Sequence, residues 1–595
     1  MFQFSSKQLV IISLIAIILF GGFLRTYHFS DWLHFELDQA RDARVVDDAL
    51  SLGPGELTLL GPKAGGTALR LAPGFYYLEY VSALVFGGTP AGMAAFVMIF
   101  SVLSLPLFYF LLRRFFPWKF SLALTLLFAV SEYAVMYGRF AWNPNLIPFF
   151  SLLGFYALLR SVDHEESRKS GWFLVSVFSL TLATHFHFLA FLALPAIFVL
   201  FLVFRRPRFP WKTWVWAGII ALCLYAPLLL NEMETGGANT REFFKAVTEK
   251  SNNEKHSLIE KALRDVSGHA LSGMVITTGF EGGTFPAVVV AKEGKWIDWT
   301  CDNRCDKGKW YGIAATLVFI ASLFSLGWLW FRTMERKRLD FLLLCGIWFG
   351  VTFTLFLPLA YDIVPRFFLL SLPLFFIFIG FVLFSIRKLF GASRIVRQAV
   401  WILLALLVVS NLFFLTQRFD ELSQAGSAAI DSPPDRILKE RIRVTLEQQN
   451  AIVDFLGERF QKTGYPVFMW SEPQHRRALK YLLEKRGIEN AVLGFDGVYR
   501  QGVYYLILRA QSDLEDALKK YRASYTVGKT TSFGTLVVIE LMPKPEAIMG
   551  ERRDFSAAKP VEIKSSPRYT WREYFSRNFS QPENIKEDIE DAEDN

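Results

Sequence analysis

The stretch ELDQARDARVVDDAL, residues Glu36–Leu50, places acidic side chains and arginines directly after the first strongly apolar segment of the chain. If this stretch is a helix, Asp38, Arg41 and Asp42 share one face, because residues three and four positions apart are neighbours on a helix surface. A carboxylate held at the mouth of a membrane span can accept a proton from an incoming hydroxyl group. The alternative interpretation is an interfacial helix with a solvated charged face. The rest of the sequence must decide between a catalytic and a purely interfacial helix.

The composition indicates an integral membrane protein. Of the 595 residues, 52% are hydrophobic, 20% are charged and 59 are phenylalanine. Long apolar runs at this frequency are not typical of a soluble protein. The net charge of +9 is carried mainly by short breaks between the apolar runs. Such breaks are what the positive-inside rule requires, so the charge does not indicate a nucleic-acid partner.

About eleven apolar segments approach the length of about 20 residues that crosses a bilayer. The first lacks a clear small-residue cleavage site, so we interpret it as an uncleaved span. The shorter segments need support from neighbouring helices or local thinning of the bilayer. The predicted spans are Gln8–Leu24, Gly92–Leu112, Phe120–Tyr137, Leu146–Leu159, Trp172–Phe186, Phe188–Phe204, Trp214–Leu230, Tyr311–Trp330, Phe341–Leu359, Phe367–Phe384 and Val400–Leu415.

The basic residues orient these spans. With a cytoplasmic N-terminus, alternate breaks are cytoplasmic, and these hold basic clusters such as Arg205–Lys212 and Arg332–Arg338. The short breaks on the other side hold little beyond Arg139 and Arg366. The asymmetry predicts a multi-pass protein of the cell (inner) membrane, with the N-terminus in the cytoplasm and the chain after about Gln417 outside it.

This topology leaves two large outer loops between the spans. The first, residues 25–90, contains glycine and proline breaks and then the aromatic run APGFYYLEY, which predicts short interfacial helices joined by turns. The second, residues 231–309, is polar and holds Cys301 and Cys305, whose spacing would allow a local disulfide outside the cytoplasm.

The composition changes after Gln417. Helix and strand patterns alternate after a linker, which predicts a small extracytoplasmic α/β domain, and the acidic end from Glu583 is expected to be disordered. The fold class is therefore a polytopic α-helical membrane domain, residues 1–417, followed by a soluble α/β domain, residues 418–595. Its expected helices are Arg436–Thr463, Gln474–Arg486 and Ser512–Tyr521, and its expected strands are Pro466–Trp470, Gly502–Arg509, Tyr525–Val527 and Gly534–Glu540.

Polar residues at the outer ends of the spans are the candidates for chemistry. Asp38 is the candidate general base, and its rivals on sequence alone are Glu36, Asp42, Asp47 and Asp48. A short outer turn, YGRFAWNPN, holds Arg139 and Asn143, which would bind a sugar or diphosphate group or else serve as turn residues.

Three further outer segments carry ionisable groups. His185 and His187 in THFHF could pair with a phosphate or bind a metal ion, although no third ligand is evident, or they could bond nearby backbone. Glu232, in NEMETGG, could contact an acceptor or a divalent cation, or begin a solvated loop. Arg366 could bind a lipid phosphate, with Tyr361 beside it, or reach ordinary headgroups. No motif requires a cofactor. A divalent cation is the one cofactor that the sequence leaves as an open possibility.

The motifs occur in a familiar order. DQARDA (38–43) is followed by APGFYYL (72–78) and FGG (86–88), then RFAWNPNLIPF (139–149), HFHF (185–188), NEMETGG (231–237) and PRFFLLSLP (365–373). This set resembles the GT-C superfamily of membrane glycosyltransferases, specifically the group of protein O-mannosyltransferases and aminoarabinose transferases. The resemblance covers about residues 1–415 and does not extend to the C-terminal domain.

The resemblance implies a polyprenyl-phosphate sugar donor, used at the outer membrane face, and a lipid, glycan or protein acceptor. It implies that Asp38 is the catalytic acidic residue, that Arg366 contacts the lipid phosphate, and that transfer inverts the anomeric centre. Two departures matter. Many relatives carry an acidic residue near the position of Asn143, and many carry Lys near His185 and His187, which would make phosphate binding depend on histidine protonation.

Two other functions share these features. A transporter or flippase of lipid-linked sugars should show inverted repeats and polar breaks at mid-bilayer, whereas the polar residues here gather at the outer ends of the spans. A polysaccharide ligase or polymerase would use the same chemistry with a different donor, and the sequence does not separate it from a glycosyltransferase.

Overall fold

The computed structural model describes residues 5–65, 67–252, 257–285, 287–289, 298–300, 303–358, 363–391, 393–430, 435–494, 497–555, 567–577 and 579. Among them, nine helices are long and apolar enough to cross a membrane, and two shorter apolar helices accompany them. These match the predicted apolar segments one for one, and the membrane class is confirmed. That all eleven cross the bilayer stays a prediction.

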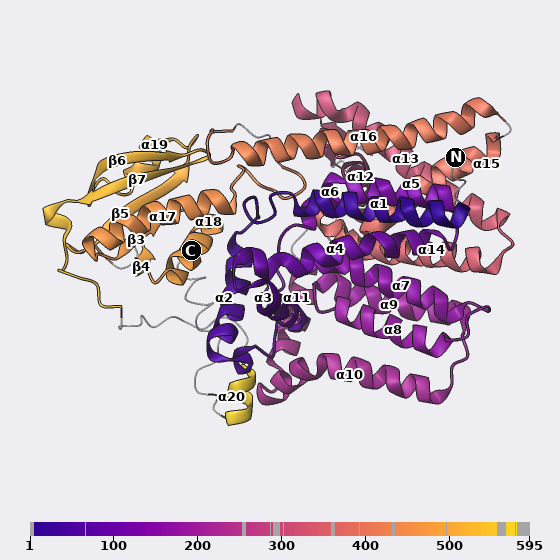
Figure 1. The fold of residues 1–595 in the computed structure, drawn as a ribbon, viewed down its shortest axis with the longest axis horizontal. Coiled ribbons are helices and arrows are strands. Elements are labelled where there is room, and N and C mark those ends of the chain that lie inside the picture. Colours follow the sequence, from indigo (N-terminus) through magenta and orange to yellow (C-terminus); the bar gives the residue numbers. More distant parts are fainter. Residues whose placement is uncertain are drawn as a thin grey trace.

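The membrane helices lie side by side in one bundle, and the C-terminal sheet lies beyond one end of it (Figure 1). The helices of the bundle are α1 (Ser6–Thr26), α4 (Pro90–Leu112), α5 (Trp118–Val130), α6 (Glu132–Tyr137), α7 (Ile147–Val162), α8 (Lys169–Ala183), α9 (Phe188–Arg205), α10 (Trp211–Glu234), α13 (Asn303–Arg332), α14 (Arg336–Phe356), α15 (Leu372–Phe390) and α16 (Arg394–Gln424). Two 3-10 turns, η2 (Asn143–Leu146) and η4 (Pro365–Ser371), lead into α7 and α15.

The basic breaks meet at the end of the bundle that is remote from the sheet. Arg114, after α4, pairs with Asp163, after α7, at 2.6 Å, and Lys337 at the start of α14 lies 3.3 Å from the same carboxylate. Arg205, which ends α9, lies 2.5 Å from Asp340. These contacts put several predicted cytoplasmic breaks on one side, as the alternation of charge requires.

One predicted span is broken in two. The segment Phe120–Tyr137 forms α5 and the short α6, because Ser131 leaves the helical path and caps α6 by accepting a hydrogen bond from the amide of Ala134. The Ser131 hydroxyl also donates to the carbonyl of Ile276 at 2.7 Å. The break turns α6 toward the end of the bundle that faces the C-terminal domain.

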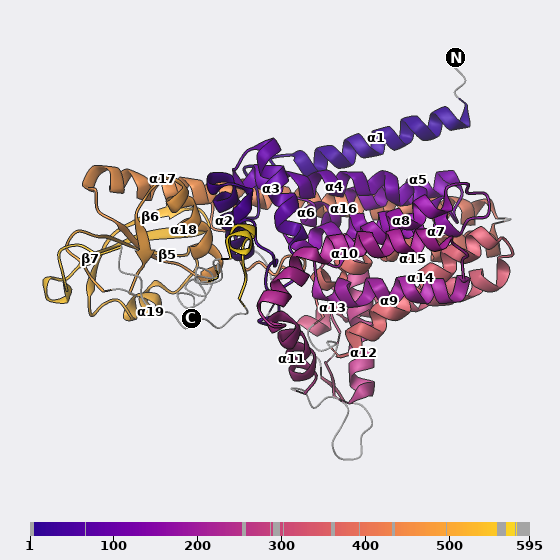
Figure 2. The ribbon, with the colours of Figure 1, turned by 90° about the horizontal axis from the view of Figure 1, so that it is seen from below.

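The second outer loop has more helix than expected. It contains α11 (Ala238–Asn252), α12 (Leu258–Thr278) and a hairpin of β1 (Ala287–Val289) and β2 (Asp298–Thr300). α12 packs against the membrane helices α13, α15 and α16, whereas the sequence suggested only a polar loop. Figure 2 shows α11 and α12 projecting beyond one side of the bundle. Cys305 is disulfide-bonded, and Cys301 lies outside the described residues.

The first outer loop forms helices across the end of the bundle, as predicted for an interfacial segment. They are α2 (Leu37–Leu52), η1 (Pro54–Glu56) and α3 (Gly74–Phe86). α2 buries Ala40, Ala43 and Val46 against its neighbours, at intervals of three residues along one face of the helix.

The C-terminal domain is a mixed sheet with helices packed on it. Its strand order is β4-β3-β5-β7-β6, with β3 parallel to β4 and β5 and the remaining pairs antiparallel. The α/β prediction is therefore correct, although it missed β4. The elements are α17 (Leu446–Thr463), β3 (Val467–Trp470), α18 (Pro473–Lys485), β4 (Asn490–Val492), β5 (Val503–Arg509), α19 (Leu514–Lys519), β6 (Tyr525–Phe533), β7 (Leu536–Pro543), η5 (Pro545–Ala547) and α20 (Trp571–Ser576).

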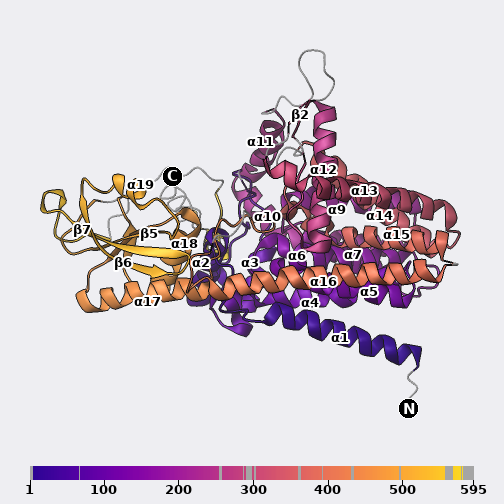
Figure 3. The same ribbon diagram turned by 90° about the horizontal axis from the view of Figure 1, so that it is seen from above.

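α16 runs along the bundle and continues to the C-terminal domain (Figure 3). Residues 435–445, which we call the crossing segment, then run non-helically back along the end of the bundle. The sequence placed this stretch inside a helix beginning at Arg436. That prediction is wrong because Thr445 caps α17 in a capping box with Gln448, so the helix begins at Leu446.

The C-terminal domain docks on the first outer loop. Asp47 on α2 receives hydrogen bonds from Tyr481 (2.6 Å) and Lys485 (2.7 Å) on α18. The chain later returns to the same loop, where the amide of Leu59 donates to the carbonyl of Tyr569 at 2.8 Å. Helix α20 follows that contact. The predicted disordered tail from Glu583 lies outside the described residues.

Candidate functional site

A cavity of about 740 Å³ lies where the bundle, the first outer loop and the C-terminal domain meet. It is lined by residues of six separate segments of the chain. These are His34, Glu36, Leu37, Asp38 and Gln39; Tyr137, Phe140 and Trp142; Arg366; Asp435, Leu438, Lys439, Glu440, Arg441 and Ile442; Gln474 and His475; and Arg509. The predicted residues Glu36, Asp38 and Arg366 are thus brought together.

Asp38 lies in the first turn of α2, where the positive end of the helix dipole favours a carboxylate. Its Oδ1 accepts a hydrogen bond from Arg41 Nη1 at 2.9 Å, and its Oδ2 accepts one from Trp142 Nε1 at 3.2 Å. The side chain remains 38% exposed. A carboxylate has about four lone-pair sites, so sites remain on Asp38 for a substrate hydroxyl.

Arg41 and Asp42 hold Asp38 from behind and do not line the cavity. Arg41 Nε donates to Asp42 Oδ1 at 2.8 Å, while its Nη1 reaches Asp38. Burial raises the pKa of Asp42 to about 6, against the opposing effect of Arg41. Arg41 and Asp42 therefore orient Asp38 and do not themselves line the cavity.

Glu36 lines the cavity next to a histidine that the sequence did not single out. His34 Nδ1 lies 2.8 Å from Glu440 Oε1, and His34 Nε2 lies 3.8 Å from Glu36 Oε2. Burial alone would lower the pKa of His34, but Glu36 and Glu440 outweigh it and raise that pKa to about 9. The two-residue spacing of His34 and Glu36 in HFEL, which puts both side chains on one side of an extended segment, was the available signal.

Arg366 opens the 3-10 turn η4 and is half-buried at the cavity wall. Its guanidinium lies 5.6 Å from the ring centroid of Phe367, and no hydrogen bond or ion pair joins it to the rest of the described chain. Tyr133 anchors the turn by donating its hydroxyl to the carbonyl of Pro365 at 2.7 Å. Tyr361, the predicted neighbour of Arg366, lies outside the described residues.

The far wall of the cavity comes from the crossing segment and the C-terminal domain, and sequence reasoning missed all of it. Gln474 and His475 begin α18, and Arg509, which ends β5, is paired with Glu472. No motif marks these residues, because they reach the site only through the docking of one domain on another.

Two predicted residues near the turn YGRFAWNPN lie outside the cavity. Arg139 is buried and donates to the carbonyls of Leu24 and Arg25 at 3.0 Å and of Tyr27 at 2.7 Å. It thereby satisfies the carbonyl end of α1, a position that favours a cation. Asn143 Nδ2 donates to the carbonyl of Phe186 at 3.2 Å and so ties this turn to the next one.

The two histidines and Glu232 also lie outside the cavity lining. His185 is buried against Tyr225, and neither ring nitrogen has a hydrogen-bond partner in the described part of the chain. His187 caps α9, its Nδ1 accepting from the amide of Leu189. Glu232 accepts from the amides of Asn239 and Thr240 and so caps the start of α11.

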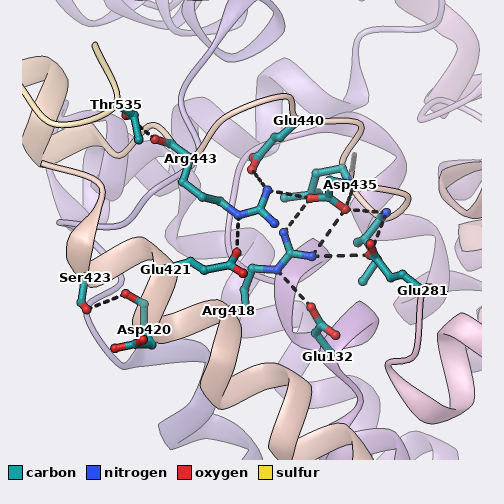
Figure 4. Close-up of polar contacts among 12 residues, drawn as sticks. Glu132, Glu281, Arg418, Asp420, Glu421, Ser423, Asp435, Glu440, Arg443 and Thr535 are labelled. Atoms are coloured by element: carbon teal, nitrogen blue, oxygen red, sulfur yellow. Dashed lines mark hydrogen bonds and ion pairs between the residues drawn. The ribbon is translucent and has the colours of Figure 1, made fainter. Parts of the chain in front are cut away.

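A buried ionic network fixes the crossing segment to the bundle (Figure 4). Arg418 on α16 pairs with Asp435 at 2.6 Å and with Glu132 of α6 at 3.0 Å. Arg443 pairs with Asp435 at 3.0 Å and with Glu440 at 2.8 Å. Burial would raise the pKa of Asp435, but the two guanidinium groups outweigh it and hold that pKa well below its usual range.

Comparison with known proteins gives a family-model match to part of the chain and a fold. Residues 70–230 match the family model described as dolichyl-phosphate-mannose-protein mannosyltransferase. No curated protein matches the chain. The crystal structure of ArnT from Cupriavidus metallidurans in the apo state is 12% identical and covers 90% of this chain and 98% of its own, with a TM-score of 0.53. The structure of ArnT bound to undecaprenyl phosphate gives 11% identity, the same coverage and the same TM-score.

The family match lies on the part of the chain that holds α3 to α10, and the ArnT-like fold extends over the C-terminal domain as well. Together with the membrane helices, these findings confirm the resemblance to GT-C membrane glycosyltransferases seen in the motifs: a mannosyltransferase family model matches residues 70–230, and the chain has an ArnT-like fold.

Proposed function

We propose that this protein transfers a sugar from a polyprenyl-phosphate donor to a hydroxyl or amine of an acceptor at the outer face of the membrane. The observation that carries the proposal is the presence of Asp38 and Arg366 on one cavity at the end of the bundle. A structural neighbour, ArnT, has been crystallised with undecaprenyl phosphate, which supports this class of donor.

The proposed reaction is a single displacement. The acceptor oxygen or nitrogen forms a bond to the anomeric carbon while the bond from that carbon to the phosphate oxygen breaks. Asp38 takes the proton of the acceptor, and the lipid phosphate leaves as an anion. One displacement inverts the anomeric centre. Base assistance of this kind contributes about 10²- to 10⁴-fold to the rate.

Arg366 is the proposed partner of the leaving phosphate. Its planar guanidinium matches two phosphate oxygens, and no ion pair with the described residues occupies it. Stabilising charge that develops on a leaving group is often the largest single contribution to catalysis. His185 and His187, by contrast, are proposed to shape the turn next to Asn143 and not to bind the phosphate.

The proposed topology assigns the remaining parts. Residues 1–417 form the membrane domain, which takes the donor from the surrounding lipid, and residues 418–595 form an extracytoplasmic domain that completes the cavity. The acceptor is a lipid, glycan or protein that approaches from that side. The cavity wall formed by Gln474, His475 and Arg509 is where the domain would contact it.

The test is a set of amide substitutions assayed for transfer and for membrane level. Asp38→Asn keeps the shape of the side chain and loses the proton acceptor, so transfer should fall by at least about 10²-fold. Asp48→Asn, on the same helix but outside the cavity lining, should have a much smaller effect. Both variants should reach the membrane at wild-type level.

Glu36 is the rival base, two residues away on the same cavity. Near-normal transfer by Asp38→Asn, together with loss of transfer in Glu36→Gln, would assign the base to Glu36. Normal transfer by both variants would remove the first outer loop from the chemistry altogether.

A further inference from the structure

His34 stands between two carboxylates from distant parts of the chain. Its Nδ1 is at hydrogen-bond distance from Glu440 Oε1, 2.8 Å, whereas its Nε2 is 3.8 Å from Glu36 Oε2, too far for a hydrogen bond. Ligand atoms lie about 2.1 Å from a zinc ion, so two of them are about 3.4 Å apart in a tetrahedral site and farther apart at wider angles. The gap between Nε2 and Glu36 is thus one that a metal ion can bridge.

Glu440 is held in place from its other side. Its Oε2 accepts a hydrogen bond from Arg443 Nη1 at 2.8 Å, while Oε1 faces His34 Nδ1. Histidines that bind metals usually donate their second ring N–H to a carboxylate, which orients the ring and leaves the other nitrogen as the ligand. Glu440 gives His34 this arrangement, with Nε2 directed toward Glu36.

A second histidine lies at the same cavity. His475 is 3% exposed, and its Nδ1 has no hydrogen-bond partner among the described residues. A buried ring nitrogen without a partner is costly unless something fills its place. His475 lines the cavity together with His34, Glu36 and Glu440, so a ligand bound at the cavity wall is available to it.

We propose that His34, Glu36 and Glu440 form a binding site for one divalent transition-metal ion of the Zn²⁺ or Mn²⁺ type. Possible ligand atoms of the three residues lie within 4.8 Å of one another. His34 Nε2 and Glu36 are the direct ligands, Glu440 orients the imidazole, and His475, which lines the same cavity, is a further nitrogen donor. A mixed set of imidazole and carboxylate suits such ions better than Ca²⁺ or Mg²⁺.

The site would act on the cavity that it borders. Its open coordination positions face the space that Asp38 and Arg366 also line, where an oxygen atom of an anionic ligand can complete the metal shell. The ion would also join the first outer loop to the crossing segment, because its ligands come from both. The proposed metal site does not depend on the proposed sugar transfer, because its residues are in place without donor or acceptor.

The experiment is a zinc titration of the metal-stripped full-length protein in detergent, without donor or acceptor. Wild-type protein should bind about one zinc ion per chain. His34→Gln and Glu36→Gln should lose that binding, and Glu440→Gln should weaken it about 10- to 100-fold, as expected for an outer carboxylate. The matched controls are His28→Gln and Asp31→Asn, which change an exposed histidine–carboxylate pair on the same loop and should bind zinc like wild type.

A spectroscopic measurement identifies the ligand. Cu²⁺ added to the stripped wild-type protein should show nitrogen hyperfine coupling from imidazole in its electron paramagnetic resonance spectrum, and His34→Gln should lack the signal from this ring. Size-exclusion profiles and melting curves show which variants are folded. If His34→Gln is not folded, the zinc titration of Glu36→Gln tests the site in its place.

The proposal is overturned if wild-type protein binds no stoichiometric zinc, or if His34→Gln and Glu36→Gln bind as much as wild type. The cation at this place would then be the proton of His34 itself, held between two carboxylates. Because donor and acceptor are absent, either result stands apart from the outcome of the transfer assays.

Discussion

Asp38 is oriented before any substrate arrives, because Arg41 and Trp142 each donate one hydrogen bond to it. Arg41 is in turn fixed by Asp42, which has no exposed surface. Hydrogen bonds to a charged group contribute about 1.5–3 kcal/mol each, so these contacts hold the carboxylate in one position. The arrangement makes the function of Asp38 sensitive to the charge of Asp42.

The pH dependence of transfer should report on Asp42. Its pKa in the folded protein, about 6, is above the ordinary 3.8, so the carboxylate takes up a proton as the pH falls through about 6 and its attraction for Arg41 is lost. Wild-type transfer should decline in that range. Asp42→Asn should be about tenfold slower at neutral pH, the equivalent of about 1.4 kcal/mol, and should lack the inflection. An unchanged inflection in this variant would assign the titration to another group.

Donor titrations should separate the two possible roles of Arg366. Arg366→Ala should raise the donor concentration needed for half-maximal transfer more than Arg366→Lys does, because lysine keeps a point charge and loses only the fork. Arg397→Ala, an exposed arginine at the start of α16, is the control and should behave like wild type. Equal, wild-type donor dependence in both Arg366 variants would mean that this side chain only reaches lipid headgroups.

At the scale of elements, the short helix α6 connects the bundle to the cavity. Glu132 pairs with Arg418, Tyr133 holds η4 through Pro365, and Tyr137 donates its hydroxyl to the carbonyl of Ile437 in the crossing segment. Three of the six residues of α6 therefore position α16, the turn that carries Arg366, and the segment that carries Glu440. The break at Ser131 is what allows one element to do this.

The network around Asp435 should be a main source of stability for this end of the molecule. Breaking a buried ion pair by removing one partner costs about 3–5 kcal/mol, because the remaining charges are left buried without compensation. Asp435→Asn should therefore lower the melting temperature of the detergent-solubilised protein markedly. Asp454→Asn is the matched control: its side chain is 70% exposed. An exposed pair contributes about 0–1 kcal/mol.

Similar melting temperatures for Asp435→Asn and Asp454→Asn would show that the crossing segment is held by its other contacts. Two such contacts are the hydrogen bond from Tyr137 to the carbonyl of Ile437 and that from the hydroxyl of Thr535 to the carbonyl of Arg443 at 2.6 Å.

At the scale of the whole molecule, the first outer loop and the C-terminal domain must lie on the same side of the membrane. α2 and α18 pack together, and Asp47 is bonded to Tyr481 and Lys485 across that contact. The basic breaks meet at the opposite end of the bundle. The positive-inside rule then predicts that the cavity lies outside the cytoplasm.

Reporter fusions test this topology. A reporter enzyme that is active only outside the cytoplasm should be active when fused after Gln424, the last residue of α16, or after Asn595, and inactive when fused after Arg206, between α9 and α10. Activity after Arg206 and none after Gln424 would reverse the orientation. Activity at neither outer position, with normal expression, would mean that the number of crossings is wrong by one.

The sequence by itself determined the membrane class, the positions of the apolar helices and the α/β class of the C-terminal domain, although it missed β4 and the start of α17. It also pointed to Asp38 and Arg366. Apolar length, basic clusters and turn residues are local properties, so they can be read from neighbouring positions in the chain. Local signals do not distinguish a residue that bonds the backbone from one that lines the cavity: Arg139 bonds carbonyls at the end of α1, and Glu232 bonds amides at the start of α11.

Only the tertiary structure decided which of these residues share a cavity. His34, Glu440 and His475 meet there because the segment before α2, the crossing segment and α18 come from distant parts of the chain and pack at one end of the bundle. No local sequence pattern predicts that these three residues share a cavity. Their proximity depends on the docking of one domain on another and on the buried pairing of Arg418 with Asp435. Contacts between residues hundreds of positions apart follow from the packing of whole elements, and their partners become visible only once those elements have been placed.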